Sequence, residues 1–470
     1  MFTKSGRGYL LGDKPQFFQM AEHVMKKLLF VLLVALVVRV AFIYELPDTA
    51  RSVDSWNWGQ VADLLASGHN PYQREGTALM AYPPFWMQTV YCMAHVATAL
   101  HVPLLRVMQA VLVGTDLLML LCLIGILREA APDRPWVWAA LFGVALNPAL
   151  ILVSCQHNQI DPIMAVGILG SIYFLCRLHR EKQMEDWLMA CLMLGIAALV
   201  KQIALVLVPL LAGGFRMASN RQRVLGTALV LGPITLGMSI IYVLSPAEVT
   251  AGVLKYHAVP GYFGISGLLH LMGREEWVGV CNVLFFVALI ASAVTLTRWT
   301  WFQLESSTEL VLAAGLLLLA IPTIGSGWAT QYCPWYVALL AATYPSHGRL
   351  WKSALATLWV ALSVTYIIDY SLNFSLGCGL PRWLAEHDHL AEAQNWLPLA
   401  QKMSEQNSQM CLRLPLFAVS LGVLMIGLFQ LFHSPKKAIQ NGQNENGRSA
   451  SSPQDRLPSG RRTKPAQRNR

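Results

Sequence analysis

The chain has 470 residues, of which 55% are hydrophobic and 13% are charged, and its mean hydropathy is +0.46. Soluble globular proteins carry about 25% charged residues, so the composition excludes that class and predicts an all-α protein with many membrane-spanning helices. The net charge of +9 is concentrated in residues 433–470, where nine Lys and Arg residues accompany two acids. We predict that this polar tail is disordered, cytoplasmic and close to anionic lipid head groups, with no nucleic acid as partner.

Residues 1–27 form a predicted cytoplasmic segment, and the first apolar run covers residues 28–42. No small-residue cleavage site follows this run, so we interpret it as an uncleaved signal anchor. Lys14, Lys26 and Lys27 precede the run, and basic flanks stay on the cytoplasmic side. The N-terminus is therefore predicted inside, and the next segment, residues 45–103, outside.

The segment from residue 54 to residue 86 does not resemble an ordinary connection. Asp54 lies among aromatic residues, and the sequences GHNPY at 68–72 and YPP at 82–84 follow. Polar residues that can do chemistry, mixed with Trp and Tyr beside a membrane, are typical of an active-site loop at the bilayer surface. A solvated loop with one interfacial aromatic belt is the alternative interpretation.

The next apolar helix, within residues 82–101, is long enough to span the membrane, but the positions of the basic linkers after it argue against a crossing. Arg128 and Arg134 form one linker, and Arg177 and Arg180 belong to the next. Both linkers lie inside only if residues 82–101 are embedded in the membrane without crossing it. We therefore predict that residues 104–127 form the second true span.

Residues 187–215 are long for one span and short for two standard ones. The linkers on both sides are basic, so we predict a hairpin of two short helices with Lys201 and Gln202 at its outer tip. Continuing the alternation gives twelve crossings in a membrane catalytic domain over residues 28–432. Both termini are then cytoplasmic, and the protein is a multi-pass protein of the inner (plasma) membrane.

This topology collects the unusual polar residues at the outer face. The collection comprises Asp54, Gln156, His157, Asn158, Gln159, Asp161, Lys201, Gln202, Tyr256, His257 and Gln331, with Arg39 and Arg106 near the outer helix ends. An acid, histidines and several cations at a membrane surface suit chemistry on anionic lipid phosphates. Two interpretations of Arg39 stay open, phosphate binding and snorkelling to the interface. Asp116 more readily holds neighbouring helices together than does chemistry.

Several catalytic motifs are missing from the sequence. Cys and His residues show no C-x-x-C or H-E-x-x-H spacing, and no D-x-D pair occurs that would hold Mg²⁺ on a nucleotide-sugar diphosphate. A P-loop and a G-x-S-x-G sequence are also absent. We therefore predict no bound metal and no cofactor.

Four motifs in this order resemble the GT-C fold membrane glycosyltransferases that use dolichyl-phosphate or other polyprenyl-phosphate glucose or mannose. They are Asp54 with the GHNPY and YPP sequences, Arg106 with Asp116, NPALIL at 147–152 leading to HNQ at 157–159, and KQIAL at 201–205 leading to Pro209. The resemblance covers residues 30–215. GWATQY at 327–332 occupies the place of the eukaryotic H-E-K-S signature, so the chain is more similar to divergent prokaryotic members.

The resemblance implies a hexosyltransferase of the cell envelope, of mannose or glucose type. The donor would be a polyprenyl-phosphate sugar, and the acceptor a lipid-linked glycan, a lipid or a protein at the outer membrane face. Asp54 would be the general base of one inverting, metal-independent displacement. The donor phosphate would be bound by Lys201, Gln202, Arg39 and Arg106. The substrates would be positioned by His157, Asn158, Gln159, Tyr256, His257 and Gln331.

Two other functions remain as alternatives. A transporter or lipid flippase would fit broken helices, although the sequence shows no duplicated halves. A lipid-linked glycan polymerase or ligase would fit the large predicted outer loop at residues 371–412. That loop contains Cys378 and Cys411, for which a disulfide and two free thiols are both open.

Overall fold

The computed structural model of the protein describes residues 14–45, 53–73, 82–130, 136–249, 263–302, 306–325, 332–369, 394, 398, 402 and 406–433. All regular secondary structure in these residues is helical, which confirms the all-α prediction. The chain divides into two compact units, Met1–Leu428 and Phe429–Arg470.

Nine helices in the described part of the chain are long and apolar enough to cross a membrane. They are Met25–Glu45, Leu104–Ala130, Val137–His157, Asp161–Glu181, Asn220–Val243, Glu275–Thr300, Ser307–Ile324, Arg349–Ile368 and Ser408–Phe432. Two shorter apolar helices, Gln202–Met217 and Pro334–Thr343, accompany them. These helices agree with a multi-pass membrane protein, whereas the predicted count of twelve crossings stays a prediction.

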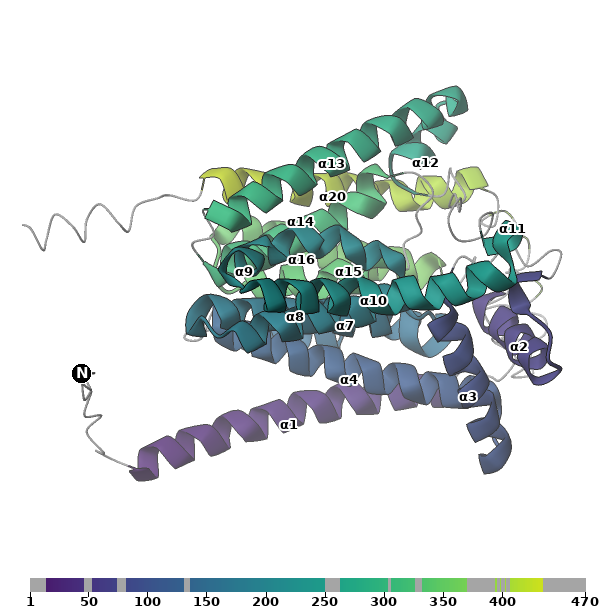
Figure 1. Cartoon of the computed structure of the whole chain (residues 1–470), viewed down its shortest axis with the longest axis horizontal. Helices are drawn as coiled ribbons and strands as arrows, with labels where there is room; N and C mark the ends of the chain where they lie inside the picture. The colour runs from purple at the N-terminus through teal and green to yellow at the C-terminus, as the bar shows by residue number, and fades with distance from the viewer. Residues whose placement is uncertain are drawn as a thin grey trace, which may run out of the picture. The chain divides into compact units, whose positions relative to one another are not determined.

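The first long helices form one side of the unit. Helix α1 (Lys14–Glu45) packs against α4 (Leu104–Ala130), as Figure 1 shows in purple and blue. Helix α3 (Pro84–Leu100) packs on the end of α4 and is steeply inclined to α1 and α4 in the same view. It has 17 residues and is not among the candidate spans. This geometry agrees with an embedded helix that does not cross.

The central helices are α7 (Asp161–Glu181) and α8 (Met184–Val200), which pack closely together and against α4 and α10 (Asn220–Leu244). A Cβ atom on Gly167 of α7 would lie 2.8 Å from the Cβ of Ala197 and 2.9 Å from the carbonyl oxygen of Met193. Only glycine allows this approach, and small residues are the usual means by which membrane helices pack closely.

The predicted hairpin is present, with Lys201 at its tip. Lys201 has extended backbone angles (φ −154°, ψ 119°) between α8 and a 3₁₀ helix, η3 (Gln202–Leu211), which continues as α9 (Ala212–Met217). The indole nitrogen of Trp187, at the start of α8, donates to the carbonyl oxygen of Leu211 at 3.1 Å. The two arms therefore run side by side.

The second arm of the hairpin is a 3₁₀ helix over most of its length; the sequence predicted two short helices without specifying their type. A 3₁₀ helix rises about 2.0 Å per residue, against about 1.5 Å for an α-helix. Ten such residues thus cover about 20 Å, and the second arm reaches back to Trp187 with fewer residues than an α-helix would need.

The remaining elements complete the helical unit. They are α2 (Val53–Ala66), η1 (Pro71–Gln73), α5 (Val137–Ala145), α6 (Pro148–Leu152), a π turn (Val153–His157), α11 (Pro246–Val249), α12 (Gly264–Leu271), η5 (Glu275–Trp277), α13 (Val278–Phe302), α14 (Ser307–Ile324), α15 (Pro334–Thr343), α16 (Arg349–Ile368) and α20 (Gln406–His433). Helices α14 and α15 pack against each other and against α7.

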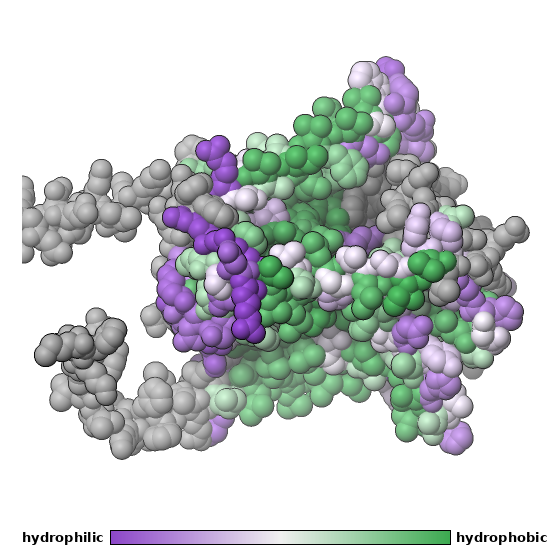
Figure 2. Space-filling model, viewed as in Figure 1, coloured by the Kyte–Doolittle hydropathy of each residue, from purple (hydrophilic) through white to green (hydrophobic). Residues whose placement is uncertain are grey.

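Apolar side chains cover the outer surfaces of α10 and α13. Leu236 on α10 is 66% exposed and Ile290 on α13 is 64% exposed. In Figure 2 the α13 surface is mostly green along its length, the right-hand end of α10 is green, and purple residues gather at the left side of the helices. An apolar band between polar ends is the surface that a bilayer requires.

The basic linkers lie together at one end of the helices, as the charge pattern predicted. A guanidinium nitrogen of Arg180 lies 3.0 Å from a carboxylate oxygen of Glu129, which joins the last turn of α7 to the last turn of α4. The Arg223 side chain donates to the carbonyl oxygen of Phe215 at 3.0 Å. We refer to this as the basic end; its assignment to the cytoplasm remains a prediction.

Candidate active site

The candidate site begins at α6 and at the π turn that follows it. Asn147 caps this helix, since its side-chain oxygen accepts from the backbone nitrogens of Ala149 (2.9 Å) and Leu150 (3.3 Å). Residues 153–157 then form a π turn, and Asn158 adopts the left-handed conformation with φ of 58°. Asparagine tolerates this conformation better than most residues, and π turns are frequent at functional sites.

The π turn aims polar side chains at α2. Nε2 of His157 lies 2.7 Å from Oδ2 of Asp54, and the side-chain nitrogen of Gln159 donates to the same oxygen. The Asn158 side chain donates to the hydroxyl of Ser55 at 3.1 Å. The sequence prediction that Asp54, His157, Asn158 and Gln159 belong together agrees with this geometry. Asp54 is 14% exposed, so its carboxylate is reachable although it is held.

Oδ1 of Asp54 is the oxygen that His157 and Gln159 leave open. Within the described ranges, Asp54 makes contacts only through Oδ2. A carboxylate oxygen without a donor can accept a proton from an incoming hydroxyl. The site therefore contains a candidate general base with one oxygen fixed and one available.

A cation lies on the hairpin tip, next to Asp161. Nζ of Lys201 is 3.0 Å from Oδ1 of Asp161 and lies over three aromatic rings. The distances to the ring centres are 5.3 Å for Tyr82, 4.4 Å for Tyr332 and 5.2 Å for Trp335. Cations are attracted to the faces of aromatic rings, and Lys201 is only 12% exposed. The aromatic rings and Asp161 therefore hold the ammonium group in a fixed position, in which it can bind an anion.

Two connections place the carboxylate and the cation in one site. Gln159, which contacts Asp54, precedes Asp161 by two residues, so the α-carbons of these two residues are at most about 7 Å apart. On the other side, Trp58 lies one helical turn after Asp54 and packs edge-on against Tyr82 with ring centres 5.4 Å apart. The two halves thus share a wall of aromatic rings.

Tyr72 fixes that wall from the loop after α2. Its hydroxyl donates to the carbonyl oxygen of Tyr82 at 2.8 Å, and Asn70 accepts from its backbone nitrogen at 3.0 Å. Burial raises the pKa of the Tyr72 phenol well above its usual range, so the hydroxyl stays neutral and remains a donor. The GHNPY and YPP sequences are therefore joined by a hydrogen bond.

Several buried acceptors in the site lack a donor. Oδ1 of Asn158, Oε1 of Gln159 and Oδ2 of Asp161 have no hydrogen-bond partner in the part of the chain that the structure describes. Buried polar atoms are nearly always hydrogen bonded, so such atoms need an explanation. All three are acceptors and lie within four consecutive residues. All three side chains are fully buried, so we assign these atoms no contact with a substrate.

Arg39 and Arg106 are engaged by protein groups. Arg39 is fully buried, and its Nε lies 2.6 Å from Oδ2 of Asp116, while its Nη1 donates to the carbonyl oxygen of Ala145 at 2.8 Å. It joins α1, α4 and α5, and we do not assign it to the phosphate site. The interpretation of Asp116 as a residue that holds helices together agrees with this pair.

Arg106 supports the π turn indirectly. Its guanidinium donates to Oε1 of Gln109 at 3.1 Å, and the Gln109 amide donates to the carbonyl oxygen of Cys155 at 2.6 Å. The latter bond satisfies a carbonyl group in the π turn. Gln202 is half-buried at the hairpin tip, and its Oε1 has no partner among the described residues.

Three predicted site residues, Tyr256, His257 and Gln331, lie outside the described residues, as does Cys378. Cys411 is exposed and has no disulfide to a described residue. Within the described ranges, no group of three or more His, Cys, Asp and Glu side chains could hold a metal ion. Metal independence and the disulfide stay predictions.

Sequence reasoning missed two site residues, Tyr332 and Trp335. Nε1 of Trp335 donates to Oδ1 of Asp161 at 2.5 Å, and the rings of Tyr332 and Trp335 stack with centres 4.4 Å apart. They precede or begin α15, about 130 residues after Lys201 in the sequence. The only signal was an aromatic pair beside Pro334 at the start of an apolar helix.

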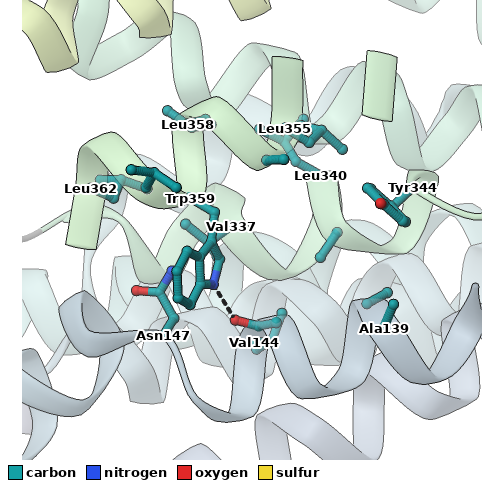
Figure 3. A pocket seen from close by; sticks show the side chains of 15 residues that line it. Ala139, Val144, Asn147, Val337, Leu340, Tyr344, Leu355, Leu358, Trp359 and Leu362 are labelled. Carbon is teal, nitrogen blue, oxygen red and sulfur yellow. Dashed lines mark hydrogen bonds between the residues drawn. The ribbon is translucent and has the colours of Figure 1, made fainter. Parts of the chain in front are cut away.

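An apolar pocket of about 260 Å³ lies between α5, α15 and α16. Figure 3 shows Asn147 beside Trp359 at one end of the pocket, and the Trp359 indole donates to the carbonyl oxygen of Gly143 at 2.6 Å. The lining includes Ala139, Val144, Val337, Leu340, Tyr344, Leu355, Leu358 and Leu362. Asn147 connects the pocket to the site, because α6 and the π turn lead from it to His157.

Comparison with known proteins supports the resemblance seen in the motifs. Residues 104–246 match the family model described as "Dolichyl-phosphate-mannose-protein mannosyltransferase". The chain is similar to this family. The match includes the π turn and Lys201 and covers less than a third of the chain. It therefore contains His157, Gln159 and Asp161 but not Asp54.

A solved structure with a related arrangement is that of ArnT from Cupriavidus metallidurans in the apo state. It is 17% identical, with a TM-score of 0.46 over 85% of this chain and 77% of that chain. At these values we draw no argument from it. No curated protein matches the chain.

Proposed function

We propose that the protein is a membrane glycosyltransferase that moves a sugar from a polyprenyl-phosphate donor to a hydroxyl acceptor. The observation that carries the proposal is the pairing of Asp54, held by His157 and Gln159, with the caged ammonium of Lys201. A base and a cation in one site are what a displacement at a sugar phosphate requires.

The proposed reaction is a single displacement. The acceptor oxygen forms a bond to C1 of the donor sugar while the bond between C1 and the phosphate oxygen breaks. The proton of the acceptor hydroxyl passes to Oδ1 of Asp54, and the electron pair of the broken bond leaves with polyprenyl phosphate. Attack opposite the leaving group inverts C1. His157 and Gln159 keep the carboxylate oriented by binding Oδ2.

Lys201 stabilises the charge that develops on the leaving phosphate. In the structure its ammonium contacts Asp161, and Trp335 donates to the same oxygen of Asp161. A bound phosphate competes with Asp161 for the ammonium, while Trp335 continues to satisfy the carboxylate. Fixed charges in a site that excludes water are worth more than in solution, because the surroundings need not reorganise.

The polyprenyl chain of the donor occupies the apolar pocket between α5, α15 and α16. Asn147, at one end of this pocket, is ten residues from His157 along a continuous helical path, which corresponds to about 15 Å. An apolar chain attached to a phosphate near Lys201 therefore has a matching surface within reach. The pocket lining is almost entirely aliphatic, with Trp359 and Tyr344 as its aromatic members.

The proposed donor sugar is a hexose of mannose or glucose type, and the acceptor is a lipid-linked glycan, a lipid or a protein at the outer face of the membrane. Membranes that contain the protein should be assayed with a panel of radiolabelled polyprenyl-phosphate hexoses and pentoses. We expect transfer from one hexose donor, with an inverted anomeric centre and no inhibition by EDTA. Absence of transfer from every donor, with the protein shown to be folded, would refute the proposal.

A further inference from the structure

A second pocket lies at the basic end of the helices. It has a volume of about 350 Å³ and is bordered by α7, the hairpin, α13 and α14. Its lining consists of Leu175, Leu178, His179, Lys182, Leu210, Gly213, Gly214, Arg216, Met217, Thr300 and Leu310. The lining is divided between apolar side chains and basic ones, which is unlike the pocket near Asn147.

Among the described residues of this lining, the charged side chains are those of Lys182 and Arg216, and both are basic. Lys182 ends α7 in the left-handed conformation, with φ of 58°, and is exposed, as is Arg216 on α9. The nearest acid in the sequence, Glu181, is bound by Arg177 at 3.1 Å and Arg180 at 2.6 Å. Its charge is therefore already matched, and the pocket attracts anions.

The apolar part of the pocket adds a second requirement on the ligand. Leu175, Leu178, Leu210 and Leu310 form apolar walls, and the Thr300 hydroxyl is turned away into a bond to the carbonyl oxygen of Pro209 at 3.0 Å. A small inorganic anion would leave these walls unfilled. An anion that carries a hydrocarbon chain would use both the cations and the leucines.

This pocket is separate from the candidate active site. Asp161 begins α7, whereas His179 lies in its last turn and Lys182 directly follows it. A helix of 21 residues is about 30 Å long, so the two sites are at opposite ends of the helix. The same holds for the hairpin, which has Lys201 at its tip and Arg216 at its far end.

We propose that this pocket binds an anionic phospholipid of the bilayer leaflet at the basic end, with the head-group phosphate between Lys182 and Arg216 and an acyl chain along the leucine walls. Basic pockets between membrane helices are a known means of binding anionic head groups. The lipid would brace the open end of the hairpin, where α7 and η3 border the same pocket.

The test uses the full-length protein, stripped of lipid and placed in nanodiscs or detergent with defined lipids. Binding of a fluorescent phosphatidylglycerol and of phosphatidylcholine with the same chains is measured by titration. We expect phosphatidylglycerol to bind more tightly, and the double variant Lys182→Ala/Arg216→Ala to lower its affinity by about tenfold or more. The matched control is Arg221→Ala, which removes an exposed basic residue at the same end that does not line the pocket.

Three outcomes would overturn the proposal. The first is equal binding of the two lipids to the unmodified protein. The second is an equal loss of affinity in the control variant, which would indicate diffuse surface charge. The third is displacement of the lipid by inorganic phosphate at equal concentration, which would indicate a site for the free anion. Because the readout is binding, the result does not depend on the proposed transfer activity.

Discussion

The ion pair at the hairpin tip permits a test that separates stability from catalysis. Lys201→Met keeps an unbranched apolar stem and removes the charge, which leaves the fully buried carboxylate of Asp161 without its cation. Breaking a buried pair on one side costs about 3–5 kcal/mol of folding free energy, and we expect the lower part of this range because Trp335 still donates to Asp161. Transfer should also fall by about 10²–10³, because the leaving phosphate loses its cation.

The double variant Lys201→Met/Asp161→Asn distinguishes the two effects. With both partners neutral, no unpaired charge is buried, so the free energy of unfolding should return to within about 1 kcal/mol of the unmodified protein. Transfer should stay low. Chemical denaturation in detergent and transfer from the polyprenyl-phosphate donor measure the two quantities. Recovery of transfer in the double variant would refute the role of Lys201 at the phosphate, because stability alone would then explain the loss.

Three further predictions concern the pocket, the topology and the cysteines. Gly143→Leu places its side chain in the apolar pocket, where a Cβ meets no atom within 4 Å. We therefore expect the KM for a long-chain donor to rise about tenfold relative to the KM for a short-chain donor. Gly114→Leu is the control, because a Cβ there also meets no atom within 4 Å, and it should change neither KM. In a variant without Cys92, Cys378 and Cys411, an impermeant maleimide should label a cysteine at His69 in intact cells and spare one at Arg180, and the reverse pattern would contradict the assignment of the basic end to the cytoplasm. His69 is preferred to Asn158 for this test because Asn158 is fully buried. If Cys378 and Cys411 form a disulfide, peptide mapping without reductant should recover the bridged peptide, and alkylation of both thiols would exclude the bridge.

Much of the candidate site could be predicted because its residues are close in sequence or occur in an ordered set of motifs. Asp54 stood out as an acid among aromatic residues, and His157 and Gln159 follow a helix break marked by Asn147 and Pro148. The hairpin could be predicted from the charges of its flanks. Basic linkers lie on both sides of residues 187–215, so this segment must enter and leave the membrane on the same side. None of these inferences required knowledge of long-range packing.

The cage around Lys201 could not be predicted in this way. It is built from Tyr82, Tyr332 and Trp335, which come from two distant parts of the chain and meet only when α15 packs against α7. The same limit applies to Arg39. Its position near a helix end allowed phosphate binding or snorkelling, and the buried partner Asp116, 77 residues later, emerges from the packing of α1 on α4.

The general base is the centre of the proposed function, and Asp54→Asn tests it most directly. Asparagine preserves the size of the side chain and can still bond to His157 and Gln159, but it cannot take up a proton. Initial rates of transfer from the polyprenyl-phosphate donor should be measured for the purified variant, with EDTA present and absent. The account predicts a fall of about 10² or more, an unchanged unfolding transition, and no effect of EDTA on the unmodified protein. Transfer at the unmodified rate by Asp54→Asn would contradict it.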